Sequence, residues 1–156
     1  MADVRLDNNE RKELIDGLNI YLANLHVLYI KLHNFHWNIV GKEFFQVHEK
    51  LEEMYNAVAK EIDEMAERVR QLGSVPDASM KVYIERAQLK GAESKKYSGE
   101  EVMECLIKDL NKMIQELRDG IQLSDKFNDE VTMDIAIASL TRYEKDLWMI
   151  ESYLGK

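Results

Sequence analysis

The chain has 156 residues, of which 46% are hydrophobic and 32% charged, and this composition indicates one globular domain over residues 1–156 and excludes a disordered chain. No apolar run reaches the roughly 18 residues of a membrane span, and the single cysteine, Cys105, excludes an internal disulfide framework. The formal net charge of −8 argues against nucleic acid or an anionic membrane as a partner. Because the N-terminus lacks the apolar core of a secretory signal, we expect a cytoplasmic protein.

The first predicted helix begins near the N-terminus and runs to about Trp37. Asp7 is followed three residues later by Glu10, which is the spacing of a capping box at a helix start. Apolar residues then recur at three- and four-residue steps: Leu14, Leu18, Tyr21, Leu22, Leu25, Leu28, Tyr29 and Leu32. This period predicts an amphipathic helix, which Gly41 interrupts.

A second periodic stretch covers residues 43–72 and ends at Gly73, with Pro76 shortly after it, as expected beyond a helix C-terminus. Its apolar positions are Phe44, Val47, Leu51, Met54, Tyr55, Val58, Ile62, Met65, Ala66 and Val69. Residues 78–87 are long enough for two helical turns, and residues 91–99 form a polar loop. A short helix is therefore expected before the next long one.

The second half of the chain predicts two more long helices. Ser98 and Glu101 have the pattern of another capping box, and residues 126–129 form a break before a last helix over residues 130–153. The apolar positions of that last helix are Val131, Ile135, Leu140, Leu147, Ile150 and Leu154. Four long helices, with a short one between the second and third, predict an all-α four-helix bundle. We expect its core to include Leu22, Leu51, Leu110 and Leu147.

Side chains that bind metals concentrate in the first half of the chain. The four histidines are His26, His33, His36 and His48, and the second helix adds Glu52, Asp63 and Glu67. At about 100° per residue, positions 48, 52, 63 and 67 fall at roughly 0°, 40°, 60° and 100° around that helix. They therefore share one narrow stripe, although any one of these residues taken alone is more often a solvated surface residue or a helix cap.

The two ends of this stripe are far apart in a single chain. His48 and Asp63 are separated by fifteen residues, about 22 Å along the helix axis, which is too far for one metal site. Two copies of the helix, packed antiparallel about a two-fold axis near residues 57–58, would bring the first pair of one chain opposite the second pair of the other. The spacing therefore predicts a shared site between two subunits, made twice per dimer.

The types of residue in this stripe limit which metal ions it could bind. Histidine and carboxylate without cysteine favour iron(II), with manganese and zinc as alternatives. Di-iron bundles usually carry Glu-x-x-His on two helices, and this chain has no such sequence. An iron site of that kind is therefore not expected in the bundle interior.

Four sequence patterns are similar to those of a known family. They are the run His33-x-x-His36-Trp37-x-x-x-Gly41-x-x-Phe44-Phe45-x-x-His48-Glu49-x-x-Glu52, the run Asp63-Glu64-x-Ala66-Glu67-Arg68, and the C-terminal Asp129-Glu-Val-Thr132-x-Asp134 and Glu144-Lys145-x-x-Trp148-Met149. Through these patterns the chain resembles the Dps family of bacterial mini-ferritins from about residue 14 to residue 154. The resemblance implies a ferritin-like four-helix subunit assembled as a hollow dodecamer. Such a particle oxidises iron(II), preferentially with hydrogen peroxide, and stores the iron(III) mineral.

The resemblance also implies a set of ligands for two irons in each of the two sites at a two-fold interface. His36, His48 and Glu52 would come from one subunit, and Asp63 and Glu67 from its partner. The family often has aspartate where this chain has Glu52.

One tryptophan and two histidines of the first predicted helix are expected to have roles other than binding metal. Trp37 resembles the family tryptophan that intercepts oxidising equivalents, and packing at a helix end is the alternative for it. His33 is expected to be a structural, hydrogen-bonding histidine, and His26 a core or surface residue.

Four acidic residues have weaker expected roles outside the ligand set. Asp129 and Asp134 resemble acids that line an iron-entry pore, and Asp129 also stands where a helix N-cap is expected. Glu49 and Glu53 are expected to face the cavity as sites of mineral nucleation.

Two alternative functions remain at this point. Some family members compact DNA through a lysine-rich tail, but residues 1–16 carry three basic and five acidic side chains, and the chain ends directly after its last predicted helix. Counterion release therefore has little to act on, and direct DNA binding is not expected. The other alternative is a bundle that binds zinc, for which His36, His48 and a carboxylate would suffice, without redox activity.

Overall fold

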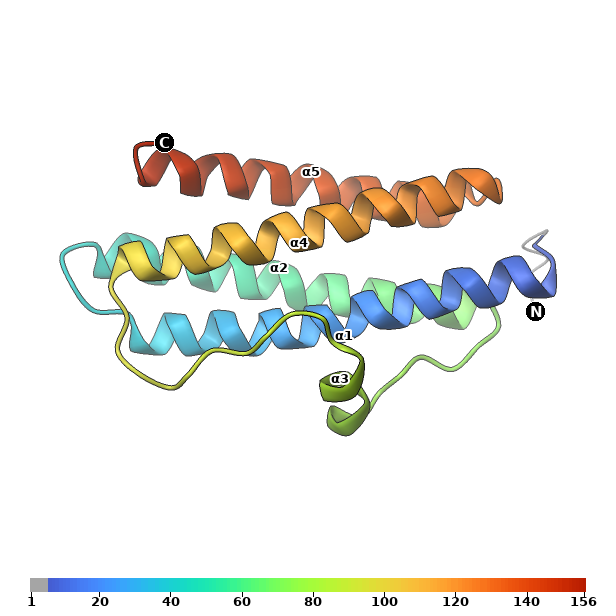
Figure 1. The fold of residues 1–156 in the computed structure, drawn as a ribbon, viewed down its shortest axis with the longest axis horizontal. Helices are drawn as coiled ribbons and strands as arrows, with labels where there is room; N and C mark the ends of the chain where they lie inside the picture. Colours follow the sequence, from blue (N-terminus) through green and yellow to red (C-terminus); the bar gives the residue numbers. More distant parts are fainter. Residues whose placement is uncertain (1–5) are drawn as a thin grey trace.

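The computed structural model describes residues 6–156, and within that range it contains five helices and no extended strand (Figure 1). The helices are α1 (Asn8–Asn38), α2 (Phe44–Gln71), α3 (Met80–Arg86), α4 (Gly99–Lys126) and α5 (Glu130–Tyr153). The predicted all-α bundle with a short helix before the third long one is confirmed. None of the helices in the described range is both long and apolar enough to cross a membrane. Residues 1–5, part of the segment on which the DNA expectation depends, lie outside that range.

Both predicted capping boxes are present. The Asp7 carboxylate accepts hydrogen bonds from the backbone N–H groups of Asn9 and Glu10 at 2.7 and 2.9 Å, and the Asp7 N–H donates to the Glu10 side chain. At the start of α4, the Ser98 N–H donates to Glu101 at 2.8 Å and the Ser98 hydroxyl accepts from the Glu101 N–H. Local sequence therefore sets where both helices begin.

The helices pair as two antiparallel hairpins, α1 with α2 and α4 with α5, joined by a long connection that runs along α1 and contains α3 (Figure 1). Side chains of α1 hold this connection through its backbone. The Asn24 side-chain oxygen accepts from the N–H groups of Gln88 and Leu89, and Lys31 donates to the Lys90 carbonyl at 3.1 Å. The connection is therefore an ordered part of the α1 surface.

The core is formed mainly by leucine, methionine and valine side chains of α1, α2 and α4. Leu22, Leu51 and Leu110 are fully buried as predicted, whereas Leu147 is only partly buried. Fully burying one such side chain contributes about 2 kcal/mol, so the sequence periodicity of these three helices accounts for most of the core.

The predicted face of α5 is confirmed only in part, because four of its residues pack against the core while partly buried: Ile135, Leu140, Leu147 and Leu154. Its buried residues are Thr132, Ala136, Ser139, Tyr143, Asp146 and Ile150, and only Ile150 belongs to the predicted set. Val131 is 52% exposed, and Leu140 and Leu147 are partly buried. The inner face of α5 is polar because its side chains have partners on α2: Asp146 pairs with Lys50 at 2.8 Å, and the Thr132 hydroxyl accepts from Arg68.

A buried carboxylate occupies the middle of the bundle. Glu61 of α2 accepts hydrogen bonds from the hydroxyls of Tyr21 and Tyr143 at 2.7 and 2.8 Å, and it pairs with Arg142. Burial raises the pKa of both phenols well above the ordinary value, with the Glu61 charge adding to the shift, so both hydroxyls remain donors. The Glu61 carboxylate therefore has three partners within the bundle, and it links α2 to α1 and α5.

Candidate metal centre

The turn between α1 and α2 brings two predicted ligands into ring contact. His36 lies in the last turn of α1 and His48 in the second turn of α2, at the end of the bundle that also holds the C-terminus (Figure 1). Gly41 adopts φ of 122° between them, a conformation in which other residues are strained. The two imidazole rings stack with centroids 3.6 Å apart and planes 19° from parallel.

The backbone fixes which nitrogen each ring offers. Nδ1 of His36 lies 2.8 Å from the His48 carbonyl, and Nδ1 of His48 lies 2.8 Å from the His36 carbonyl. A carbonyl only accepts, so each Nδ1 carries a proton, and in the neutral ring it is therefore Nε2 that offers a lone pair. This reciprocal arrangement orients both rings as metal ligands before any metal binds.

Glu52 completes a group of three. One ligand atom from each of His36, His48 and Glu52 lies within 4.8 Å of the other two, and this is the one such group of three or more found in residues 6–156. Lys50 stands between two of them in sequence, but its Nζ bonds Asp146 of α5 and Glu53 of α2. Its positive charge is therefore taken up by acids outside the group.

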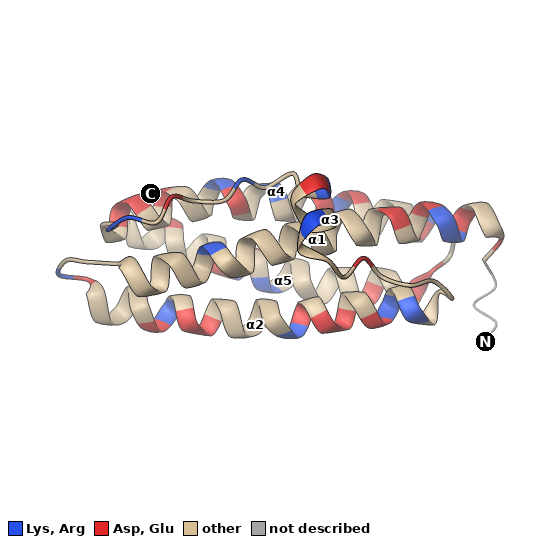
Figure 2. Cartoon of the chain, turned by 90° about the horizontal axis from the view of Figure 1, so that it is seen from below, with Lys and Arg blue, Asp and Glu red and all other residues tan. Residues whose placement is uncertain are grey.

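The structure places Asp63 and Glu67 exposed on α2, apart from this group. Figure 2 shows acidic residues recurring along the length of α2. At the midpoint of the stripe, Val58 is buried in the core, so the outward residues at that level are Asn56 and the half-buried Ala59. The single chain therefore supplies one half of the predicted ligand set at each end of an outward stripe.

Aromatic rings surround the histidine pair. Phe44 stacks on His48 with centroids 4.9 Å apart, and Tyr55 meets His36 edge-on at 5.2 Å. Burial raises the pKa of the Tyr55 hydroxyl, and the neighbouring Glu52 charge adds to the shift, so this phenol is protonated at neutral pH. Tyr55 was expected from the sequence only as an apolar position of the second helix. Its position one turn after Glu52 was the signal that it would lie beside the stripe.

Large apolar side chains are exposed next to the group. Trp37 is 70% exposed and Phe45 is 75% exposed, although the residues directly before them, His36 and Phe44, are buried and partly buried. The Trp37 ring is tilted against the His33 ring, and the two centroids are 5.3 Å apart. Exposed aromatic side chains clustered beside polar ones are typical of a surface that another protein covers.

The other singled-out residues are placed as follows. His33 stacks on Tyr55 at 3.8 Å and its Nδ1 bonds the Tyr29 carbonyl, which agrees with a structural role. His26 is half-buried and stacks on Tyr83 of α3.

The two acids with an expected pore role differ in exposure. Asp129 caps α5 through the Thr132 N–H and pairs with Arg68 at 2.7 Å, both side chains being buried. Asp134 is exposed, as are Glu49 and Glu53. The capping interpretation of Asp129 is confirmed, and its carboxylate is engaged within the chain.

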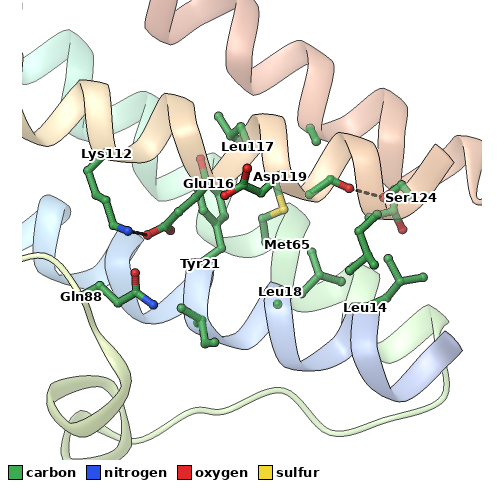
Figure 3. Close-up of a pocket in the computed structure, with 16 residues that line it drawn as sticks. Leu14, Leu18, Tyr21, Met65, Gln88, Lys112, Glu116, Leu117, Asp119 and Ser124 are labelled. Atoms are coloured by element: carbon green, nitrogen blue, oxygen red, sulfur yellow. Dashed lines mark hydrogen bonds and ion pairs between the residues drawn. The ribbon is translucent and has the colours of Figure 1, made fainter. Parts of the chain in front are cut away.

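A groove of about 270 Å³ lies elsewhere, between α1 and α4 (Figure 3). Its lining is mostly apolar, including Leu14, Leu18 and Met65, and an ion pair between Lys112 and Glu116 stands at its rim. It contains neither of the predicted histidine ligands, so it is separate from the candidate metal centre.

Comparison with known proteins shows the family to which the chain belongs. The ferritin-like domain family matches residues 15–156. General stress protein 20U of Bacillus subtilis is 40% identical over 144 residues, covering 92% of this chain and 99% of that protein. DNA protection during starvation protein 2 of Bacillus anthracis is 39% identical over 145 residues, covering 93% of this chain and 99% of that protein. The crystal structure of a Dps protein from Vibrio cholerae, a member of the superfamily of ferritin-like diiron-carboxylate proteins, superposes with a TM-score of 0.91 at 34% identity, covering 96% of this chain and 93% of that one. The chain therefore belongs to the Dps family of ferritin-like proteins.

Proposed function

We propose that this protein oxidises iron(II), with hydrogen peroxide as its preferred oxidant, and stores the iron(III) product inside a hollow particle of twelve chains in the cytoplasm. The observation that supports this most is the reciprocal hydrogen bonding of His36 and His48, which leaves two Nε2 lone pairs beside the Glu52 carboxylate. Two imidazoles and a carboxylate suit iron(II), and zinc is the expected substitute.

The site is completed by a second subunit. Two α2 helices packed antiparallel about a two-fold axis would place Asp63 and Glu67 of one chain opposite the histidine pair of the other. The exposed Trp37 and Phe45 support such a contact, because a partner surface would remove both rings from water. Each dimer would then hold two sites, each with room for two irons.

The chemistry requires two irons together. Hydrogen peroxide accepts two electrons on reduction to water, and each iron(II) supplies one. The Glu52, Asp63 and Glu67 carboxylates stabilise iron(III) over iron(II) because they neutralise the additional charge. Pairwise oxidation consumes peroxide without releasing hydroxyl radical, so storage and protection follow from one reaction.

Other residues serve this reaction at a distance. Trp37 intercepts oxidising equivalents that escape the site, as its position directly after His36 allows. The exposed Asp134 belongs to the iron-entry path, and the exposed Glu49 and Glu53 to the cavity lining where mineral nucleates. Acidic side chains concentrate cations along such a path, in accord with the net charge of −8 per chain.

The proposal is tested by anaerobic addition of iron(II) followed by peroxide or oxygen, with the ferric absorbance in the near ultraviolet as the measurement. Rapid oxidation at two irons per peroxide, faster than with oxygen, is the expected result. Binding of iron(II) or zinc without oxidation would instead identify the non-redox metal-binding alternative.

A further inference from the structure

The groove between α1 and α4 opens beside the N-terminal half of α1, whereas the histidine pair lies at the last turn of that helix (Figure 3). Buried side chains of the other two long helices, Met65 of α2 and Ala136 of α5, also line it, so it reaches between the two helical hairpins. Apolar cavities of about 150 Å³ bind benzene, and pockets for drug-sized ligands begin at about 300 Å³. At about 270 Å³, the groove has room for a small molecule.

Two glycines leave this groove open. Gly17 of α1 and Gly120 of α4 both line it, and they are the only two glycines in the interior of a helix within residues 6–156. Glycine inside a helix is destabilising relative to alanine. Neither glycine has a positive φ, and a Cβ added at either would meet no other part of the chain within 4 Å. Backbone conformation and close packing therefore do not require glycine at these positions, whereas an open groove does.

The hydroxyl groups that line the groove are already bonded within the chain. The Tyr21 hydroxyl donates to Glu61 at 2.7 Å, and the Ser124 hydroxyl donates to the Gly120 carbonyl at 2.8 Å. The Thr132 hydroxyl is bonded both to α2 and to the N-cap of its own helix. These parts of the lining therefore offer a ligand apolar contact rather than a hydrogen bond.

One end of the groove is polar. Gln88 of the connection lies there with Lys112 and Glu116 of α4, whereas Leu14 lies at the other end (Figure 3). Lys112 and Glu116 pair at 3.3 Å, so their charges offset each other. Asp119 is exposed, where water and salt screen its charge. A charged head group would therefore find no unpaired counter-ion among these residues, whereas a hydroxyl can bond the Gln88 amide or the Glu116 carboxylate.

We propose that this groove binds a small, uncharged, mainly apolar molecule with one hydroxyl group, an alcohol or phenol. Its hydroxyl bonds at the Gln88 and Glu116 end, and its apolar part lies along the two glycines. The wall of α1 from Leu14 to Tyr21 spans seven residues, about 10 Å, which is comparable with an extended eight-carbon alcohol. The site is separate from the iron chemistry proposed above, because it contains none of the residues of the metal group.

The experiment titrates the assembled protein with n-octanol and follows binding by calorimetry and by the melting temperature. Wild type should bind one molecule per chain and melt at a higher temperature, because the ligand binds the folded state and contacts both hairpins. In a series of alcohols, affinity should rise about fourfold with each added carbon while the chain fits, and should stop rising once the groove is full. Octanoate and octylammonium have the same chain length and should bind several-fold more weakly.

Leucine substitutions provide a filled groove and a matched control. Gly120→Leu places an apolar side chain in the groove, and it should abolish octanol binding without loss of stability in urea, since leucine is the better helix former. Gly17→Leu fills the groove from the opposite wall and provides the same test if Gly120→Leu does not fold. Gly91→Leu is the control, because a Cβ there also meets nothing within 4 Å and Gly91 does not line the groove. It should bind octanol as wild type does.

Three results would overturn the proposal. The first is a wild-type protein that binds no octanol, and the second is a folded Gly120→Leu or Gly17→Leu protein that binds it as wild type does. The third is binding that appears only after the particle is dissociated, since a second copy of the chain would then cover the groove. Tighter binding of octanoate or octylammonium than of octanol would refute the uncharged class of ligand.

Discussion

Replacing Glu61 tests whether the middle of the bundle is held by hydrogen bonds. Glu61→Ala would leave the buried hydroxyls of Tyr21 and Tyr143 without their acceptor and Arg142 without its counter-ion. An unsatisfied buried polar group costs about 1–3 kcal/mol, and breaking a buried ion pair by removing one partner costs about 3–5 kcal/mol. Because Arg142 is partly exposed and regains water, we take the lower end for the ion pair and for each of the two hydroxyls, and we expect a loss of about 5 kcal/mol in the free energy of unfolding.

The assay is equilibrium urea unfolding at one fixed subunit concentration, since assembly would otherwise contribute to the apparent stability. Tyr21→Phe is the matched control: it removes one hydroxyl and leaves Glu61 with Tyr143 and Arg142, so a loss of about 1 kcal/mol is expected. Iron binding should be unchanged in folded Glu61→Ala. A variant within about 1 kcal/mol of wild type, or one that loses iron stoichiometrically while remaining folded, would refute the interior as described.

Three further predictions concern the surface and the assembly. Asp129→Asn should destabilise the fold by about 3 kcal/mol at neutral pH because it leaves the buried Arg68 uncompensated. Burial opposes ionisation of Asp129, but hydrogen bonds from Thr132 and Arg68 outweigh this effect and lower the pKa of its carboxyl group. The difference in the free energy of unfolding between wild type and Asp129→Asn, measured by urea unfolding, should therefore shrink as the pH falls below about 4 and persist at higher pH. Supercoiled plasmid should not be retarded in a gel at neutral pH and physiological salt, and a clear shift would require a basic surface made by assembly. Light scattering should find a closed particle of twelve chains, and a stable monomer would contradict the shared site.

Sequence periodicity was sufficient for the helices whose inner face is apolar. In α1, α2 and α4, leucine, valine and methionine at three- and four-residue steps face the core, and side-chain caps at Asp7 and Ser98 mark two helix starts. These signals are local, so they can be read without knowing what packs against them.

Periodicity failed for α5 because its inner face is made of polar groups with distant partners. Tyr143 is fully buried against Glu61, and Asp146 against Lys50, each pair separated by more than eighty residues in sequence. No local pattern shows that such a polar side chain will be satisfied. Of the apolar positions of α5 that were predicted as core, Val131 is exposed and most of the others are only partly buried.

Some features of the candidate metal centre could likewise be predicted from the local sequence and others could not. The proximity of His36 and His48 follows from a short turn between two predicted helices, whereas their reciprocal bonds to each other's carbonyl depend on how the two backbones meet. The outward stripe on α2 came from helical spacing, and its assignment to two subunits remains a prediction.

Mixing two inactive variants tests the shared site most directly. His36→Ala and Asp63→Ala should each fold, because Asp63 is exposed and His36, although buried, lies in the last turn of α1 rather than among the leucine side chains of the core. Each should oxidise iron slowly because one ligand is missing. In a mixed two-fold dimer, one site has both defects and the other has none, so random assembly of equal amounts restores about a quarter of the sites.

The measurement is peroxide-dependent iron oxidation in particles shown by mass spectrometry to contain both variants. The account predicts recovery toward about a quarter of the wild-type rate in mixed particles and none in unmixed blends of the two. Wild-type rates in either single variant, or no recovery in particles that are demonstrably mixed, would contradict it.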